Sequence, residues 1–380
     1  MTSEVMGRST GENGRMMQRR RFTALAAIVA LALVAAACGD DDDTEAGGDG
    51  GAGGGDFTAC QVTDTGGVDD KSFNQTAYKG IEDAADELGF EPDYLESQTE
   101  ADFAPNIDAY VSQGCDLIVT VGFLLGDATA AAAEANPDQL FAIVDNDLFD
   151  TAAEEDRNYD NVAELVFSTD QAAFLAGYVS AAMSETGTVG TYGGINIPTV
   201  NIFMKGFQLG VEQYNEDNGT DVELIGWDNA NPDGGLFTGD FEDEAKGRAT
   251  TQSLLDQQAD VIMPVAGPVG QGTIAAIEAA GSDAKVVWVD TDGCVSVEES
   301  CDLFLTSVMK NMDVAVYDTA IAAAEDEFEG GTNLGTLEND GVGIAPFHEF
   351  EDEVPDEVKE RLEELRQGII DGEIQTSPDA

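Results

Sequence analysis

Residues 61–80 read QVTDTGGVDDKSFNQTAYKG, and this stretch joins a predicted strand to a predicted helix. The apolar strand at 57–62 runs into a polar turn that contains Gly66 and Gly67, and the helix begins near residue 71. Glycine supplies backbone conformations that other residues avoid. In an open α/β sheet, ligands bind in the crevice outside the carboxyl ends of the strands. The residues expected at the mouth of such a site are Asp64, Asp69, Asp70, Phe73 and Asn74.

Phe73 has two interpretations, because it is a large aromatic residue that directly follows a polar strand-to-helix turn. On the inner face of the helix, with Ala77 and Ile81 behind it, it would be a core anchor. Facing the turn, it would offer a flat surface on which a ring can stack. The stretch alone leaves both interpretations open.

Beyond this stretch, apolar strands alternate with amphipathic helices as far as residue 168, and the pattern restarts at 169. Continuous apolar strands separated by helices indicate a parallel sheet that is covered on both faces. Two such series predict an α/β fold with two doubly wound lobes and a central ligand cleft. Residues 330–343 are expected to form a flexible return segment. The expected division is a signal peptide at 1–37, a disordered tether at 38–56, lobe 1 at 57–168 and 294–326, and lobe 2 at 169–293 and 327–380.

The composition is strongly acidic. The 380 residues include 76 Asp and Glu against 16 Lys and Arg, and the net charge is −60. From Cys38 onward the chain has 74 acidic and 11 basic residues, a net charge of −63. Such a surface repels nucleic-acid phosphates and anionic lipid headgroups, so neither is an expected partner. It indicates a well-solvated surface, of the kind that adaptation to salt also produces.

The N-terminus has the pattern of a bacterial export signal. Three arginines at 19–21 precede an apolar run at 22–34 that is too short for a comfortable membrane span. Small residues then lead to Cys38, as at a lipoprotein cleavage site, although Ala35 stands where leucine is usual. Ordinary signal cleavage near the alanines is the alternative. Residues 39–55 cannot bury a core, so the chain is expected to be tethered through a lipidated Cys38 to the extracytoplasmic face of the cell membrane.

The remaining four cysteines are an even number in an oxidising compartment. Cys60 and Cys115 lie at strands that should be neighbours, and Cys294 and Cys301 bracket a short loop, so we expect these two disulfides. No CxxC motif or Cys/His set indicates a metal, and the single histidine, His348, cannot anchor one. The sequence therefore predicts neither a metal nor another cofactor.

Candidate ligand-facing positions follow several predicted strands. They are Asp64, Gly122, Phe123, Asp145, Asp147, Gly267, Asp290, Asp292 and Lys310. Two lobes would bring acidic residues from three strand ends together. Phe241, in a loop that opens a helix, would either pack locally or complete an aromatic sandwich with Phe73. Lys310 is one of only eleven basic residues after Cys38, and its alternative role is a structural ion pair with a neighbouring carboxylate.

The motif DTGGVDDKSFNQ at 64–75, together with Gly80, resembles the signature of the basic membrane protein family. These PnrA-like bacterial lipoproteins bind purine nucleosides for ABC import. Other segments resemble the family in the same order, across about residues 57–320: Gly122 with Phe123, 141–145, 171–178, 193–194, 206–207, Gly267 with Gly270, 289–292 and 307–311.

The resemblance implies a type I periplasmic-binding-protein fold and a substrate-binding protein without enzyme activity. Its partners would be a purine nucleoside and the permease and ATPase of an ABC transporter. The base would lie between Phe73 and Phe241. Contacts to the ribose and the ring would come from Asp64, Asp145, Gly267, Asp292 and Lys310. The chain departs from the family in its acidity, in an insertion at 228–237 and in the loop at 294–301.

A neutral nucleoside suits these residue types. Carboxylates accept hydrogen bonds from vicinal hydroxyls, whereas three converging carboxylates would repel a phosphate, and no segment resembles a P-loop. One rival is a metal-dependent nucleoside hydrolase, in which Asp64, Asp69 and Asp70 hold a divalent ion. That rival lacks a second group positioned to assist the leaving base. Another rival is a sugar-binding transport lipoprotein of the same fold, since aromatic stacking and Asp acceptors also suit pyranoses.

Overall fold

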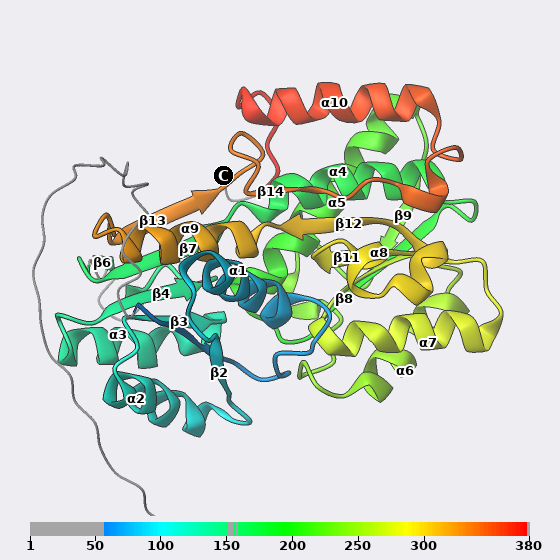
Figure 1. The fold of residues 1–380 in the computed structure, drawn as a ribbon. Coiled ribbons are helices and arrows are strands. Elements are labelled where there is room, and N and C mark those ends of the chain that lie inside the picture. The colour runs from blue at the N-terminus through cyan, green and yellow to red at the C-terminus, as the bar shows by residue number, and fades with distance from the viewer. Residues whose placement is uncertain (1–56, 151–154, 157–158, 378–380) are drawn as a thin grey trace, which may run out of the picture. The chain divides into compact units, whose positions relative to one another are not determined.

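The computed structural model describes residues 57–377, except 151–154 and 157–158. The predicted signal peptide, the tether and Cys38 lie outside these residues. The described chain forms two six-stranded sheets, each with its own helices (Figure 1). Within it, no helix combines the length and the apolar character needed to cross a membrane. The predicted α/β class with two doubly wound lobes is confirmed.

The first sheet has the order β13-β7-β4-β3-β1-β2, and all its strands are parallel. Its strands are β1 (Ala59–Thr63), β2 (Asp93–Glu96), β3 (Leu117–Val121), β4 (Leu140–Val144), β7 (Val162–Phe167) and β13 (Gly331–Gly335). Its helices are α1 (Phe73–Leu88), α2 (Phe103–Gln113), α3 (Gly126–Ala135) and α9 (Met312–Ala324). A separate antiparallel pair consists of β5 (Phe149–Asp150) and β6 (Glu155–Asp156).

The second sheet has the order β14-β12-β11-β10-β8-β9, in which only β14 runs antiparallel to its neighbour. Its strands are β8 (Thr188–Gly193), β9 (Glu223–Ile225), β10 (Val261–Val265), β11 (Lys285–Asp290), β12 (Phe304–Lys310) and β14 (Val342–Ile344). Its helices are α4 (Thr169–Met183), α5 (Pro198–Asn218), α6 (Glu244–Asp256), α7 (Gln271–Ala280), α8 (Gly293–Ser296) and α10 (Asp356–Ile370). Short 3₁₀ helices occur at Glu100–Asp102, Phe123–Leu125, Pro232–Gly234, Gly267–Gly270, Glu298–Leu303 and His348–Phe350.

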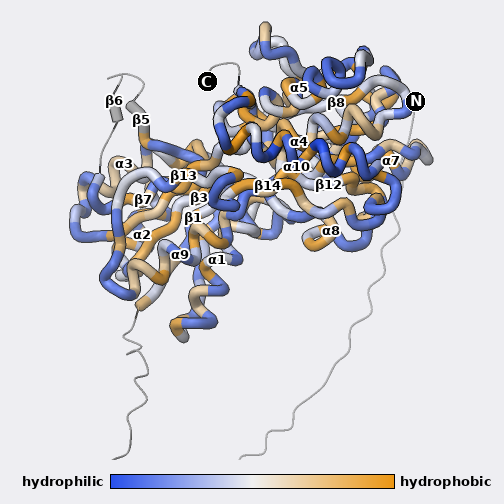
Figure 2. Tube along the Cα trace, turned by 90° about the horizontal axis from the view of Figure 1, so that it is seen from above, coloured by the Kyte–Doolittle hydropathy of each residue, from blue (hydrophilic) through white to orange (hydrophobic). Residues whose placement is uncertain are grey.

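Both faces of each sheet are covered, because alternate residues of a strand point to opposite sides. On β3, Val119 packs in the cluster that holds α1 and α9, whereas Ile118 packs in the cluster that holds α2 and α3. On β10, Met263 faces the side of α4 and α5, and Ile262 faces the side of α6. Figure 2 shows the resulting concentration of apolar residues along the strands. Continuous apolar strands were therefore a reliable signal of burial on both faces.

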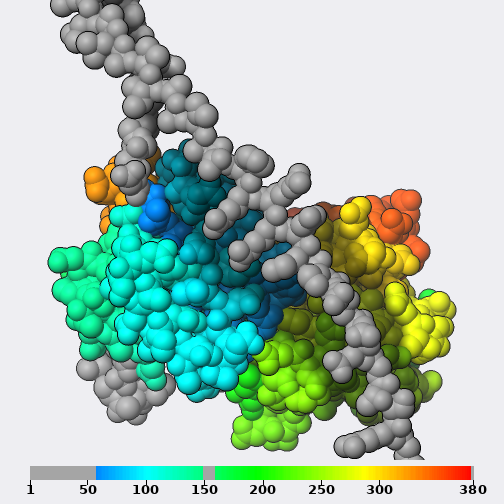
Figure 3. All heavy atoms as spheres, turned by 60° about the horizontal axis from the view of Figure 1, so that its bottom comes forward, coloured from blue at the N-terminus to red at the C-terminus, as the bar shows by residue number. Residues whose placement is uncertain are grey.

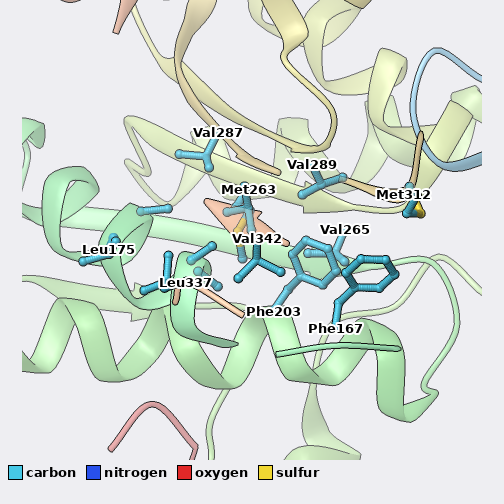
Figure 4. Packing of buried hydrophobic residues seen from close by; sticks show 14 of the residues in the cluster. Phe167, Leu175, Phe203, Met263, Val265, Val287, Val289, Met312, Leu337 and Val342 are labelled. Carbon is cyan, nitrogen blue, oxygen red and sulfur yellow. The ribbon is translucent and has the colours of Figure 1, made fainter. Parts of the chain in front are cut away.

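One apolar cluster extends from the first lobe into the second. It includes Val316 of α9 and Ala77 of α1, and also Val287 and Met263 of the second sheet. In Figure 4, Phe203 of α5 lies among the valines of that sheet. The two lobes therefore share a core on the side where the chain crosses between them.

The structure corrects the predicted lobe boundaries in two places. Strand β12 was expected in lobe 1, but it pairs with β11 and belongs to the second sheet. Strand β13 lies in the segment expected as a flexible return, yet it pairs with β7 at the edge of the first sheet. The chain thus crosses between the lobes after β7, after β12 and after β13. Pairing between strands that are distant in the chain produces no local sequence pattern. For this reason the sequence assigned β12 and β13 to the wrong lobes.

Disulfide bonds join Cys60 to Cys115 and Cys294 to Cys301 in the structure, the pairing expected from the sequence. The first links the start of the first sheet across neighbouring strands, because β1 lies beside β3. The second closes a short loop between α8 and β12. Their sequence separations are 55 and 7 residues.

The loop lengths predict different contributions of the two disulfides to stability. By chain entropy alone, a 55-residue loop corresponds to about 4 kcal/mol and a 7-residue loop to about 2 kcal/mol. In urea unfolding, the free energy of unfolding should therefore fall more for Cys60→Ala/Cys115→Ala than for Cys294→Ser/Cys301→Ser. Non-reducing peptide mapping of the wild type is the control. Free thiols at these four positions would refute the pairing.

Candidate functional site

The carboxyl ends of strands from both sheets meet at one cleft, which contains about 530 Å³ of empty space including its open mouth. A cleft between two lobes is a usual location for a small-molecule site. The residues that line it are Asp64, Thr65, Asp70, Phe73, Asn74, Gly122, Phe123, Asp145, Ile197, Thr199, Val200, Phe203, Phe241, Val265, Ala266, Gly267, Pro268, Asp290 and Lys310.

Asp64 stands at the end of β1, and a neighbouring glycine makes room for it. Its backbone N–H donates to the carbonyl of Val121, and its Oδ1 accepts from Asn74 Nδ2 at 3.1 Å. A Cβ on Gly122 would lie 2.2 Å from Asp64 Oδ2, and Gly122 has a φ of +121°. Only glycine therefore fits at this position beside the carboxylate.

Asp70 is a capping residue for α1. Its carboxylate accepts backbone N–H bonds from Ser72 (3.0 Å), Asn74 (2.8 Å) and Gln75 (3.1 Å). These donors would otherwise be unpaired at the start of a helix. Asp70 thereby fixes the direction in which α1 presents Phe73 and Asn74 to the cleft.

A buried ammonium connects the two lobes at the cleft. Lys310, the last residue of β12, makes a charged hydrogen bond to Asp145 of the first lobe, and its Nζ lies 3.5 Å from Asp290 Oδ1 of the second lobe. The side chain of Lys310 is 2% exposed and those of both aspartates are 8% exposed. A buried charge is tolerated when it is paired, and removing one partner of such a pair is strongly destabilising.

The two aspartates that pair with Lys310 share an unusual backbone conformation. Asp145 follows β4 with a φ of +65°, and Asp290 ends β11 with a φ of +70°. The left-handed region is uncommon outside glycine and is a form of strain that occurs at functional sites. In both cases the bend occurs where the strand ends at the cleft.

Asp64, Asp145 and Lys310 in this cleft have shifted pKa values. Burial raises the pKa of Asp64 to about 8, and the hydrogen bond from Asn74 opposes this rise. Burial also raises the pKa of Asp145, which the charge of Lys310 partly offsets. For Lys310, burial acts to lower the pKa, but Asp145 and Asp290 outweigh it and leave the pKa raised. Lys310 thus remains an ammonium at neutral pH, while Asp64 holds its proton.

Aromatic residues reach the cleft from both lobes. Phe73 begins α1, and its ring centroid lies 4.7 Å from Lys310 Nζ. Phe203 of α5 lies 5.3 Å from the same nitrogen. Phe241 comes from the loop before α6, and a Cβ on Gly194 would clash with its ring at 2.2 Å. Phe73 is half-buried against the main core and also lines the cleft, so its position leaves both interpretations of its role open.

Most of the residues predicted from the sequence gather in this cleft. They are Asp64, Phe73, Asn74, Asp145, Phe241, Gly267 and Lys310. Gly267 has a φ of +52°, and a Cβ there would meet no atom within 4 Å, so the backbone is open on that side.

The prediction differs from the structure at Asp292, which is not part of the cleft lining. Its Oδ1 accepts from the backbone N–H of Cys294 and caps α8, and its Oδ2 lies 2.8 Å from His348 Nε2. Asp290, two residues earlier, lines the cleft instead. In the sequence V-D-T-D-G the strand ends at the first aspartate, and the second begins the next helix.

The cleft lining also includes residues at the start of α5 that were not predicted from the sequence. These are Ile197, Thr199, Val200 and Phe203. Their signal was a strand, β8, followed by a glycine pair and then by Pro198 at the first turn of a helix. This is again a loop that follows the carboxyl end of a strand, like the loops in which ligand-facing residues were predicted.

The three aspartates that a metal-dependent nucleoside hydrolase would use do not form a cluster of potential metal ligands. Asp69 is 78% exposed at its side chain and pairs with Lys71 at 2.5 Å, while Asp70 caps α1. Within the described part of the chain, one group of potential metal ligands is close together, namely Asp292, Cys294 and His348. The Cys294 sulfur is bonded to Cys301, so it is not a free thiolate.

The raised pKa of Asp64 predicts how stability changes with pH. The unfolded chain loses this proton near pH 4, whereas the folded chain keeps it to about pH 8. Folding therefore binds a proton in this range, and Asp64 lowers the free energy of unfolding as the pH rises from 4 to 8. Asp64→Asn keeps the acceptor for Asn74 and removes the titration. As the pH rises from 4 to 8, the free energy of unfolding of the variant in urea experiments should increase relative to that of the wild type, by up to about 1.4 kcal/mol per pH unit.

The control for this titration is Asp138→Asn, at an exposed position. It should track the wild type across the same pH range. A stability difference between Asp64→Asn and the wild type that does not change with pH would show that Asp64 is ionised throughout.

Comparisons with known proteins agree with this geometry. Residues 57–379 match the family model Bmp, described as ABC transporter substrate-binding protein PnrA-like. The chain is 33% identical to a CD4+ T-cell-stimulating antigen of Listeria monocytogenes, with 84% of this chain and 87% of that protein covered. It is 30% identical to the ABC transporter nucleoside-binding protein BmpA of Lactococcus lactis, with 84% and 88% covered.

A solved structure supports the same assignment. An ABC transporter solute-binding protein from Aeropyrum pernix superimposes with a TM-score of 0.73 at 28% identity, over 84% of this chain and 92% of that one. The expected periplasmic-binding fold is thereby confirmed. The chain belongs to the Bmp family of PnrA-like ABC transporter substrate-binding proteins.

Proposed function

We propose that the cleft binds a purine nucleoside and that the chain presents it to the permease of an ABC importer. The observation that carries this proposal is the composition of the cleft. Phe73 from one lobe and Phe241 from the other line the same space as Asp145, Asp290 and the buried Lys310. A flat apolar ring and a polyol are the two halves of a nucleoside, and the cleft offers surfaces for both.

The base would lie at the aromatic end. Two aromatic faces from opposite lobes can hold a planar ring, and stacking of this kind is worth about 1–3 kcal/mol per base. Asn74 Oδ1 is buried and has no hydrogen-bond partner among the described residues. It would accept from an exocyclic amine or a ring N–H. Asp64, protonated at neutral pH, would donate to a ring nitrogen beside it.

The ribose would lie beside Lys310. The carboxylates of Asp145 and Asp290 accept hydrogen bonds from vicinal hydroxyls, and the ammonium donates to a hydroxyl oxygen. Two carboxyl groups face one ammonium here, so acidic groups outnumber the cation. A neutral ligand fits this field, and a phosphate does not.

The relatives support the ligand class. The Lactococcus lactis protein is named as nucleoside-binding, and the alignment covers most of both chains. Neighbours named as sugar transporters, or solved with bound tagatopyranose or myo-inositol, share only the fold, at identities of 12–17%. A metal-dependent nucleoside hydrolase would need a cluster of metal ligands beside the substrate. Asp64, Asp69 and Asp70 do not form such a cluster.

We also propose that a lipidated Cys38 anchors the chain on the extracytoplasmic face of the membrane. This rests on the basic, apolar and small-residue pattern before Cys38 and on relatives that are named lipoproteins. Mass spectrometry of the mature protein from a bacterial host would show an acylated Cys38. An unmodified N-terminus between residues 35 and 39 would refute the anchor.

Phe73→Ala tests the stacking surface. Isothermal titration calorimetry with adenosine, guanosine, inosine and a panel of sugars, with and without chelator, should show nucleoside binding alone and no effect of the chelator. In Phe73→Ala the nucleoside affinity should fall by roughly one to two decades, because one aromatic face is lost.

The matched control is Phe90→Ala. Phe90 is also a half-buried aromatic residue of the first lobe, it packs edge-on to Phe57, and it does not line the cleft. It should lower the melting temperature and leave affinity unchanged. If Phe73→Ala behaves like Phe90→Ala, Phe73 is a core residue and the stacking model is wrong. Binding of a sugar in place of nucleosides would establish the alternative ligand class.

A further inference from the structure

Two consecutive residues at the start of α1 contact the second lobe. Ser72 Oγ donates to Asp290 Oδ2 at 2.8 Å and lies 3.2 Å from the carbonyl oxygen of Val289. The indole Nε1 of Trp288 donates to the carbonyl oxygen of Lys71 at 3.3 Å. Figure 3 shows blue residues from the early part of the described chain beside green and yellow residues of the second lobe. These contacts join the lobes beside the cleft.

These contacts are shielded from water. Ser72 is 0% exposed and Trp288 is 1% exposed. A buried polar group that loses its partner costs more than an exposed one, because water does not replace the bond. Ser72 itself is not among the residues that line the cleft, although the next residue, Phe73, is. Ser72 therefore acts between the lobes without touching the space for the ligand.

The backbone on both sides is bent to make these contacts. Lys71 has a φ of +60° and Asp290 has a φ of +70°. The bend at Lys71 occurs one residue before Ser72, where the Lys71 carbonyl meets Trp288. Asp70, through its bonds to the backbone of Ser72, Asn74 and Gln75, holds the turn in place. Strained residues persist only where their surroundings over-determine them.

We propose that Lys71 and Ser72, with Trp288 and Asp290, form an inter-lobe clasp, and that Ser72 is a positioning residue for ligand binding. The clasp holds the lobes in the arrangement in which Phe73 and Asp290 face the same ligand. It also leaves Asp290 Oδ1 directed at Lys310, since Oδ2 is occupied by Ser72. The clasp is distinct from the ion pair of Lys310 with Asp145, which lies within the cleft.

The clasp affects affinity through the population of the joined arrangement. A ligand that contacts both lobes binds only when they are together, so its apparent affinity is reduced by the fraction of molecules in that state. Ser72→Ala removes the hydroxyl and lowers this fraction. The loss of one hydrogen bond to a charged group corresponds to a change in affinity of about tenfold.

The experiment compares Ser72→Ala with Ser180→Ala in full-length protein. Ser180 is equally buried, but its Oγ donates to the backbone carbonyl of Ala176 within α4, so its hydrogen bond lies inside one lobe. Trp227→Phe is introduced in all chains so that Trp288 is the remaining tryptophan and reports on its own surroundings. Three properties are measured: small-angle X-ray scattering without ligand, Trp288 emission, and nucleoside affinity by calorimetry.

Ser72→Ala should enlarge the radius of gyration of the ligand-free protein and shift Trp288 emission to longer wavelength. It should also weaken nucleoside binding about tenfold, and saturating nucleoside should restore the compact form. Ser180→Ala should do none of these. Trp288→Phe keeps an aromatic ring and removes the N–H donor, so it should enlarge the radius of gyration in the same way. This variant replaces Ser72→Ala in the test if Ser72→Ala does not fold.

Unchanged scattering and emission in Ser72→Ala would overturn the clasp, whatever happens to the affinity. The ligand choice rests on the proposed function, but the ligand-free measurements do not. If no nucleoside binds to the wild type, the proposed function fails, and the clasp is still decided by scattering and emission.

Discussion

A buried ammonium joins the two lobes at the cleft. Lys310 ends a strand of the second sheet, and its partners end strands in both sheets, at Asp145 and Asp290. Because an unpaired charge in this position is strongly unfavourable, the pairing requires three strand ends to converge. Phe73 and Phe203 lie close to the ammonium and add favourable aromatic contacts. The cleft, its charge and its ring-binding surfaces all depend on this convergence.

The general plan of the molecule could be predicted from local signals. Helices α1 and α2 end where glycines adopt positive φ, at Gly89 and Gly114. The strands were recognisable because burial on both faces makes them continuously apolar. These properties depend on short segments, so they can be predicted from the local sequence.

Features that depend on distant partners could not be predicted in the same way. The sequence offers two aspartates after β11, and which of them faces the ligand depends on where the strand bends, at Asp290. Strand β13 reads as a glycine-rich return segment until β7 pairs with it. The partner of the Lys310 ammonium was left open between ligand and carboxylate, and the structure shows carboxylates from both lobes. The sequence indicated which residue types matter, and tertiary contacts decided their roles.

The central claim is that this cleft selects a neutral ligand because carboxylates outnumber its one cation. The most direct test is calorimetry of the wild-type protein with guanosine and with guanosine 5′-monophosphate under the same conditions. A phosphate brought near Asp145 and Asp290 meets like charges in a poorly solvated space. The account predicts binding of guanosine and an affinity for the monophosphate at least about 100-fold lower, which is about 2.7 kcal/mol. Equal affinity for the two would contradict it.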